Sequence, residues 1–230
     1  MVKPLLEIAC FSPQALLQAA NSPADRLEYC AHYAHGGITP PFTGFDHLRK
    51  QVTQPIYVMI RCRAGDFVYS NAEVKRMQQQ IRDFQSAGAN GFVFGALLPH
   101  DRLDQFALEK LAQAADEHPW SFHRAFDQCQ EPEQALQTLL QAGCSNLLTS
   151  GCTTNALNGM EQLRQYSTLA GSRMRILAGG GLRSHNIGQL LAENLDLDYH
   201  SAALLPGTEL PDLQEISRLK QLIEQHQNSL

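Results

Sequence analysis

The chain has 230 residues, of which 43% are hydrophobic and 18% are charged, and its net charge is −5. This composition can bury a large core and excludes a disordered chain, while the absence of any Lys or Arg run disfavours nucleic acid and anionic membranes as partners. No segment reaches the ~20 apolar residues of a membrane helix, and Glu7 interrupts the apolar start before it reaches signal-peptide length. We therefore expect a cytoplasmic protein.

Short apolar runs rich in β-forming residues alternate with amphipathic helical stretches along the whole chain. The predicted strands cover 5–10, 26–30, 56–62, 91–97, 120–126, 146–151, 175–181 and 197–203, and each precedes a predicted helix. Residues typical of helix starts and stops fall between them, at Ser12, Ser70, Pro132, Gly88, Gly143 and Gly171. The last helix is expected from about Leu213 to Gln225.

This alternation predicts a parallel sheet, because right-handed crossovers place the helices outside parallel strands. Eight repeats favour closure into a (β/α)8 TIM barrel over an open sheet, and the length of the chain is typical of that fold. No linker or low-complexity tract marks a boundary, so residues 1–230 are expected to form a single domain.

Charged and titratable residues interrupt the predicted strands, although strands of a parallel barrel are covered on both faces and are usually apolar. They are Glu7, Arg26, Glu28, Arg61, His123, Arg124 and His200. Because side chains alternate along a strand, Arg26, Glu28 and Cys30 are expected to share the interior face of the second strand. The same reasoning can place Arg61 and His123 inward.

Two interpretations of this interior set stay open. The residues form either a buried ion network that fills the barrel and sets the strand register, or a polar active site at the mouth, where the carboxyl ends of the strands meet. The number of contributing strands favours the active site.

Two segments near the mouth add candidate residues. The loop after the third strand, RCRAGDFVYS, carries Asp66, and the fifth strand runs through FHRAFD to Asp127. An imidazole such as that of His123 suits general acid/base catalysis near neutral pH, and a neighbouring carboxylate could fix its tautomer. The alternative is a hydrogen-bonded structural histidine.

The seventh strand ends in a glycine-rich segment, Gly179 to Gly181, and Ser184 follows as a predicted helix N-cap. Backbone N–H groups of such a loop can form an anion cradle, and barrels often bind phosphate between the loops after strands seven and eight. Ser201 would supply the other half, with Ser150 at the neighbouring strand. The alternative is a tight turn without a ligand.

Six cysteines without a secretory signal are expected to be free thiols and not a disulfide framework. None of them forms a C-x-x-C pair, so any metal site would have to be assembled from distant segments.

Seven blocks of sequence, in order along nearly the whole chain, resemble the CutC family of copper homeostasis proteins. They are ADRLEYC (24–30), GGITPP (36–41), MIRCRAGDFVYS (59–70), FHRAFD (122–127), LTSG (148–151), AGGG (178–181) and HSAA (200–203). The resemblance implies a TIM barrel, a cytoplasmic location, a role in copper binding or tolerance, and a homodimer or higher homo-oligomer. It also implies that nine residues match family motif positions: Glu7, Arg26, Glu28, Arg61, Asp66, His123, Arg124, Asp127 and His200.

The chain departs from the family pattern at three positions and in one region. Cys62 stands in place of a proline, Pro41 in place of a serine, and Tyr29 in place of a small aliphatic residue. The region after the eighth strand is shorter, which leaves less chain for a lid or a partner contact.

The copper function needs soft ligands, since Cu(I) prefers thiolate and thioether. Cys10, Cys30 and Cys62 end three consecutive predicted strands, but alternation turns Cys10 and Cys62 outward and leaves Cys30 near the interior. Cys129 and Cys152, in the loops after strands five and six, could approach each other. The candidate copper ligands are Cys30, Cys10 and Cys129.

An alternative function is that of an enzyme acting on a small anionic metabolite, a phosphate or a carboxylate, with no organic cofactor. The candidate catalytic residues are His123 as the acid/base, Glu7 and Asp127. The candidate substrate-binding residues are Arg26, Glu28, Arg61, Asp66, Arg124, Ser150, Gly180, Gly181, His200 and Ser201. A third interpretation is an inert barrel that acts only through its surface.

Overall fold

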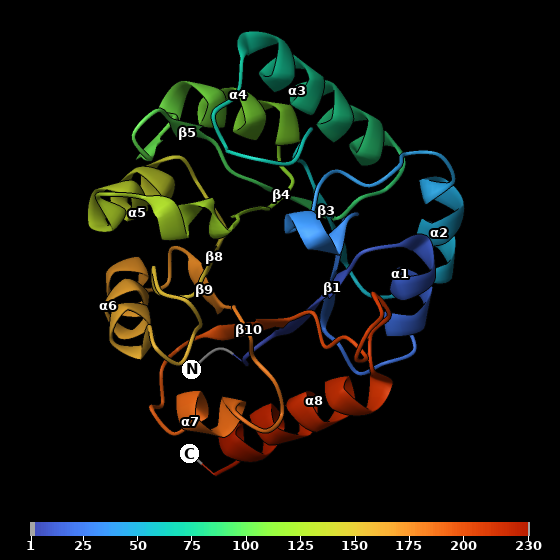
Figure 1. Cartoon of the computed structure of the whole chain (residues 1–230), viewed down its shortest axis with the longest axis vertical. Helices are drawn as coiled ribbons and strands as arrows, with labels where there is room; N and C mark the ends of the chain where they lie inside the picture. The colour runs from blue at the N-terminus through green and yellow to red at the C-terminus, as the bar shows by residue number, and fades with distance from the viewer. Residues whose placement is uncertain (1–2, 230) are drawn as a thin grey trace.

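The computed structural model describes residues 3–229, and its centre is a closed barrel of parallel strands (Figure 1). The barrel strands are β1 (Leu6–Cys10), β2 (Arg26–Tyr29), β3 (Ile56–Met59), β4 (Gly91–Phe94), β7 (Trp120–Phe122), β8 (Asn146–Thr149), β9 (Arg175–Ala178) and β10 (Asp198–Ser201). They pair in chain order, and β10 closes the ring against β1, with His200 opposite Glu7. The predicted (β/α)8 TIM barrel is confirmed.

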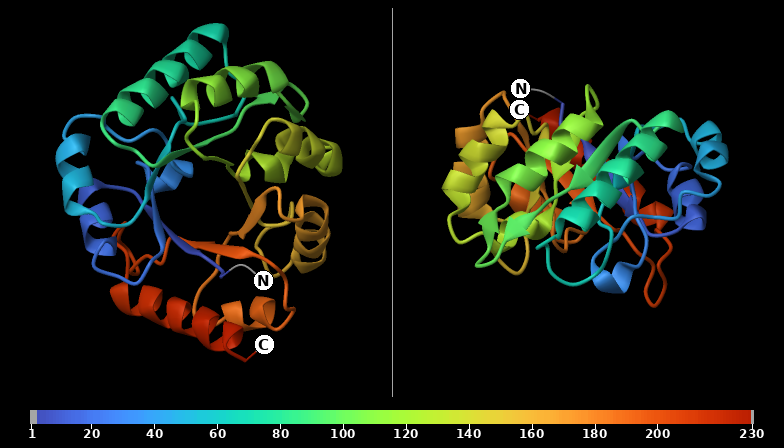
Figure 2. Two further views of the ribbon diagram at one scale, coloured as in Figure 1. Left: turned by 180° about the vertical axis from the view of Figure 1, so that it is seen from behind. Right: turned by 90° about the horizontal axis from the view of Figure 1, so that it is seen from above.

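The helices form a ring around the strands, as the view from behind shows (Figure 2, left). They are α1 (Pro13–Ala19), α2 (Phe45–Gln51), α3 (Asn71–Ser86), α4 (Gln105–Ala115), α5 (Pro132–Gln141), α6 (Met160–Ala170), α7 (Ile187–Leu191) and α8 (Leu213–Gln227). Ser70 and Glu73 form a capping box at the start of α3, which satisfies backbone N–H groups that the helix leaves free. No helix within residues 3–229 is long and apolar enough to cross a membrane.

The barrel strands separate two apolar layers. Leu6, Ile8 and Cys10 of β1 belong to the main core, which lies between the strands and the helices. Cys30 and Met59 belong to a smaller cluster in the barrel interior. The alternation predicted for Cys10 and Cys30 is thus observed.

Several strands end earlier than predicted. β3 ends at Met59 and β7 at Phe122, so Arg61, His123 and Arg124 lie beyond the strands, at the mouth of the barrel. Arg124 belongs to the short 3-10 helix η2 (Arg124–Gln128). These side chains therefore lie just past the strand ends, where a polar group can face a cavity, and the backbone N–H of His123 still donates to the Phe94 carbonyl of β4.

The segment after β4 also differs from the prediction. Instead of continuing the barrel strand, β5 (Leu97–Leu98) pairs antiparallel with β6 (Arg102–Leu103) in a small separate hairpin.

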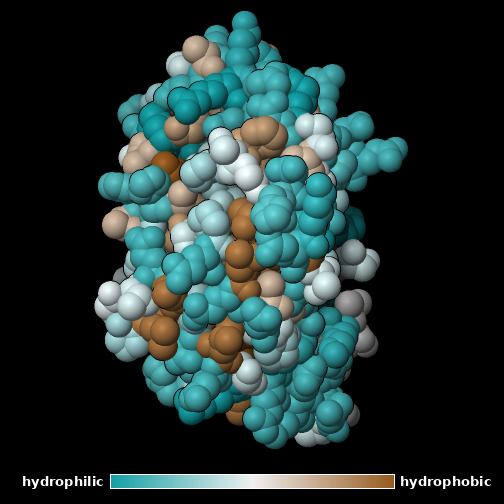
Figure 3. Space-filling model, turned by 90° about the vertical axis from the view of Figure 1, so that its right-hand side faces the viewer, coloured by the Kyte–Doolittle hydropathy of each residue, from teal (hydrophilic) through white to brown (hydrophobic). Residues whose placement is uncertain are grey.

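The surface above α1 and α2 is mostly hydrophilic, with hydrophobic side chains in separate small patches (Figure 3).

The predicted N-cap of the helix after β9, Ser184, is wrong. α7 begins after Asn186, so Ser184 does not cap it. Ser184 instead donates hydrogen bonds to Glu215 of α8, from its hydroxyl to Oε2 (2.7 Å) and from its backbone N–H to Oε1 (2.6 Å). This loop is therefore fixed to the last helix.

Candidate functional site

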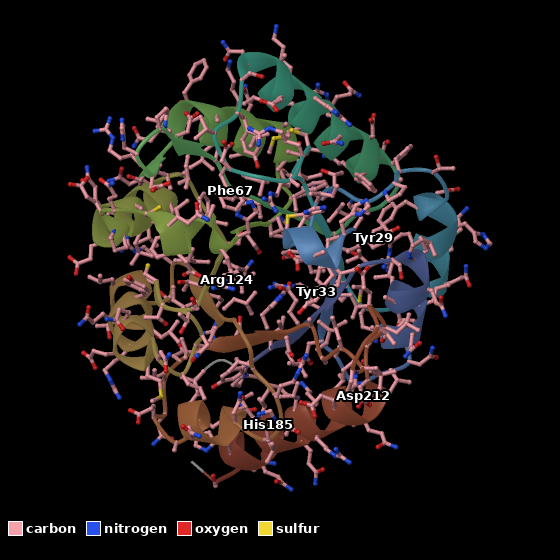
Figure 4. The ribbon with its side chains drawn as sticks, viewed as in Figure 1. Tyr29, Tyr33, Phe67, Arg124, His185 and Asp212 are labelled. Atoms are coloured by element: carbon pink, nitrogen blue, oxygen red, sulfur yellow. The ribbon has the colours of Figure 1, made fainter. Side chains whose placement is uncertain are left out.

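A cavity of about 250 Å³, here called the mouth pocket, opens where the loops after the barrel strands meet. It is lined by nine of the predicted site residues: Glu28, Cys30, Arg61, His123, Arg124, Gly180, Gly181, His200 and Ser201. Figure 4 shows Tyr33, Phe67 and Arg124 around the centre of the barrel, with Tyr29, His185 and Asp212 farther out. A pocket at this end of the barrel is where TIM-barrel proteins place their active sites.

Beneath the pocket, Glu7 on β1 contacts two side chains from neighbouring strands. Arg26 donates from Nε to Glu7 Oε2, and His200 Nδ1 lies 2.8 Å from Glu7 Oε1. Burial opposes ionisation of Glu7, but the Arg26 charge and the contacts with His200 outweigh it, so the pKa of Glu7 falls well below its usual range. Burial also opposes the charged form of His200, yet the hydrogen bond to Glu7 and the charges of Glu28 and Glu7 raise the His200 pKa.

Glu28, on β2, faces the pocket and is 3% exposed. Its Oε2 lies 3.8 Å from His200 Nε2, while its Oε1 has no hydrogen-bond partner among residues 3–229. Burial raises the pKa of Glu28 to about 7, with Glu7 adding to the rise and His200 and Arg26 opposing it. The sequence suggested a binding role, but a carboxyl group with this pKa is also suited to proton transfer near neutral pH.

His123, which follows β7, is held in one neutral tautomer. Its Nδ1 accepts a hydrogen bond from the backbone N–H of Ala125 (3.2 Å). Burial, together with the nearby Arg61 charge, lowers the His123 pKa to about 3. The proton of the neutral ring therefore sits on Nε2, which has no acceptor in the described chain. This arrangement suits a hydrogen-bond donor better than the expected general acid/base.

Arg61 lies beyond β3 and is a buried cation. In the part of the chain that is described, no carboxylate lies within ion-pair distance of it. Its guanidinium donates from Nη1 to the carbonyls of His35 (2.7 Å) and Gly37 (3.0 Å) and from Nη2 to that of Gly65 (2.6 Å). Its Nε has no partner in residues 3–229. The guanidinium also lies over the Phe67 ring, with Cζ 4.6 Å from the ring centroid.

Asp127 orders a loop instead of orienting His123. It accepts hydrogen bonds from Arg124 Nε (2.7 Å), from the backbone and hydroxyl of Ser150, from Thr149 Oγ1 and from the Cys152 backbone. No hydrogen bond joins Asp127 to His123 within the described residues, and the backbone of Ala125 fixes the histidine tautomer instead. Ser150 lies behind Arg124, which donates to its hydroxyl (3.0 Å).

The glycine-rich loop after β9 forms one wall of the pocket. Gly180 and Gly181 have φ angles of 105° and 80°, a conformation that favours glycine. A side chain at Gly180 would meet Ser150 Cβ at 3.1 Å and Arg124 Cζ at 3.6 Å, so the loop needs glycine to pack this closely. Ser201 accepts a hydrogen bond from Arg183 Nη1 (3.1 Å) and donates one to the Leu182 carbonyl (2.8 Å).

Seven predicted site residues do not line the pocket. Glu7 and Arg26 lie beneath it, Asp127 and Ser150 contact Arg124 from behind, and the other three lie farther away. Asp66 is exposed and pairs with Arg63 (2.8 Å). Cys10 packs in the outer core, and Cys129 lines a separate surface cavity. Cys129 and Cys152 do lie near each other, since both thiols face carbonyl groups of η2. Within residues 3–229, no group of three or more His, Cys, Asp or Glu side chains is arranged to hold a metal ion.

Sequence reasoning missed several residues of the pocket wall, above all Arg183, Phe67 and Tyr33. Arg183 carried a usable signal, because it is a cation two positions after the predicted anion-binding glycines. Phe67 lies in the loop that was singled out for Asp66. Tyr33, in the short 3-10 helix η1 (Tyr33–His35), carried none.

Comparisons with known proteins agree on one family. The model of the CutC family matches residues 4–204. A family protein CutC of Pasteurella multocida is 36% identical over 228 residues, which cover 93% of both chains. The copper homeostasis protein cutC homolog of Homo sapiens is 35% identical over 199 residues, covering 86% of this chain and 73% of the human one.

A solved structure supports the fold. The crystal structure of the CutC protein from Streptococcus agalactiae superposes with a TM-score of 0.80 at 24% identity, covering 86% of this chain and 98% of that chain. The similarity in sequence extends over most of the barrel, including every strand that contributes to the mouth pocket. The chain belongs to the CutC family.

Proposed function

We propose that this protein serves copper homeostasis and holds Cu(I) as cargo in the mouth pocket, through the sulfur atoms of Cys30 and Met59. One observation carries the proposal: the two side chains lie together against Gly37. A side chain at position 37 would meet Cys30 Sγ at 3.7 Å and Met59 Cε at 3.6 Å. Thiolate and thioether are the soft ligands that select Cu(I). The names of the human and mouse relatives support the same role.

Binding would have to displace the thiol proton of Cys30. Burial raises the Cys30 pKa well above its usual range, and the charges of Glu28, Cys10 and Glu7 add to the rise. Because the ligand is the thiolate, Cu(I) competes with a proton, and the affinity is expected to increase with pH.

Titration of the protein with Cu(I) against a competing chelator tests the proposal. We expect one tightly bound Cu(I) per chain, loss of that binding in Cys30→Ser, and weakening in Met59→Leu, which keeps the apolar volume but removes the sulfur. Repeating the titration at a higher pH should strengthen binding.

Cys62→Ser is the matched control, because Cys62 is half-buried and packs against the outer core. This variant should keep the copper site. Copper binding no tighter than that of a free thiol, or binding that survives in Cys30→Ser, contradicts the proposal.

The remaining expectations from the family resemblance carry over as part of this proposal. The protein functions as a single barrel domain in the cytoplasm, and it assembles into a homodimer or a higher homo-oligomer.

A further inference from the structure

Some of the charged side chains that line the mouth pocket have an oppositely charged partner, and others have none. Arg124 is paired with Asp127 (2.7 Å), and Glu28 faces His200. Arg61 and Arg183 also line the pocket, but neither has a carboxylate within ion-pair distance in residues 3–229. Two cations thus face the cavity without a protein counter-charge.

Two buried donors in this region also lack acceptors. Arg61 Nε and His123 Nε2 belong to side chains only 5% and 4% exposed, and neither atom has a hydrogen-bond partner among the residues that are described. Leaving a buried donor unpaired is costly, so such atoms point to a ligand. Phe67 holds the two groups in one place, with its ring centroid 4.6 Å from Arg61 Cζ and 4.8 Å from the His123 ring.

The glycine-rich loop provides a third set of donors. The backbone N–H groups of Gly180, Gly181 and Leu182 donate no hydrogen bond to residues 3–229, and all three residues line the pocket. Consecutive free N–H groups in a loop with positive φ angles form an anion-binding concavity. Arg183 follows directly and is oriented by Ser201.

We propose that the mouth pocket binds a small metabolite through an oxyanion group, held by Arg61, Arg183, the Nε2–H of His123 and the N–H groups of residues 180–182. Glu28 also lines the cavity and its Oε1 has no partner among residues 3–229, so a metabolite that carries a hydroxyl beside the oxyanion would offer this carboxyl group a hydrogen bond. The cavity of about 250 Å³ is smaller than the ~300–1,000 Å³ of sites for drug-sized ligands, so the metabolite has few heavy atoms. This binding site uses neither Cys30 nor Met59.

Calorimetric titration with three probes tests the proposal and distinguishes the two kinds of oxyanion. Glycerol 3-phosphate carries a phosphate and hydroxyls, glycerate carries a carboxylate and hydroxyls, and glycerol carries hydroxyls alone. We expect binding of at least one of the two anions and none of glycerol. Tighter binding of glycerol 3-phosphate assigns a phosphorylated metabolite, and tighter binding of glycerate assigns a carboxylic acid.

Two arginine variants then locate the site. Arg183→Gln removes a half-buried charge and should weaken anion binding about tenfold or more, since charge-assisted hydrogen bonds are the stronger ones. Arg49→Gln is the matched control, because Arg49 is a half-buried arginine that donates to the Gln54 carbonyl outside the pocket, and this variant should bind as the wild type does. His123→Phe, which removes the Nε2 donor but keeps a planar ring, should also weaken binding.

Failure of both anions to bind overturns the proposal, as does full affinity in Arg183→Gln. Cys30→Ser should keep the anion affinity, so the result is independent of whether the copper site exists.

Discussion

The barrel interior contains two groups of buried titratable residues that are organised in opposite ways. Under the mouth pocket, Glu7 of β1 contacts both Arg26 of β2 and His200 of β10. Beyond β3 and β7, Arg61 and His123 contact backbone groups and an aromatic ring but no carboxylate in the described chain. Burial is similar in the two regions, and only the partners differ.

This difference shows that the two interpretations suggested by the sequence each describe one region. A set of charges that neutralise one another across adjacent strands is suited to fix the strand register, although Arg26 Nη2 also lacks a hydrogen-bond partner among residues 3–229. Donors left without acceptors in a cavity are suited to bind a ligand. The two regions should therefore respond differently to substitution and to pH.

The largest effect is expected from breaking the paired region. Arg26→Met leaves Glu7 buried without its main cation, and breaking a buried ion pair on one side costs about 3–5 kcal/mol. Urea unfolding at pH 7 should show this loss in the free energy of unfolding. The double variant Glu7→Leu/Arg26→Met should recover much of it, because no lone buried charge remains. A loss below about 1 kcal/mol in Arg26→Met would show that the pair is not the main contact.

The second prediction concerns the pH dependence of the folding stability of the metal-free protein, to which Glu28 contributes. The Glu28 pKa is about 7 in the folded chain, against 4.5 for an ordinary glutamate, so the unfolded chain ionises first and the folding stability falls as the pH rises through this range. The loss amounts to about 3 kcal/mol above pH 7. Glu28→Gln removes it, so the variant should gain stability relative to the wild type between pH 5 and pH 8. A constant difference between the two proteins would contradict the raised pKa.

The smallest effect is expected from His123, which should lower the folding stability as the pH falls and not as it rises. The His123 pKa is about 3 when folded, against 6.5 for an ordinary histidine, so the unfolded chain takes up a proton first as the pH falls. The wild type should lose about 2 kcal/mol between neutral pH and about pH 5, and His123→Gln should not show this loss. His47→Gln is the control, since His47 is exposed. Chemical unfolding at several pH values measures the slopes, and identical slopes for His123→Gln and the wild type would argue against a neutral His123.

The barrel could be predicted because the pattern of strands and helices repeats along the sequence. The apolar runs and helix signals recur eight times, and alternation along β1 and β2 was enough to place Cys10 outside and Cys30 inside. The strand ends were less predictable. A polar residue such as Arg61 looks the same in sequence whether it continues a strand or leaves it, and two-residue strands such as β5 have no periodicity to detect.

The roles within the site depended on contacts that sequence does not encode locally. Asp127 binds backbone groups of the loop after β8, more than 20 residues away, and the tautomer of His123 depends on one backbone N–H. The raised pKa of Glu28 results from burial and from the charge of Glu7 on β1, against the opposing effect of His200 on β10. Residue types and strand positions identified most of the pocket lining, whereas the division of roles required the three-dimensional arrangement.

The contact between Ser184 and Glu215 gives the last helix a function beyond covering the barrel. α8 lies after the family-matched residues, yet Glu215 holds the loop that carries Gly180, Gly181 and Arg183. Further along α8, Lys220 binds Asp25 at the start of β2 (2.7 Å). The carboxyl-terminal helix thus contacts both ends of the barrel, the loop at its mouth through Glu215 and the start of β2 through Lys220. A chain cut before Glu215 would retain all eight barrel strands but lose the support of its mouth.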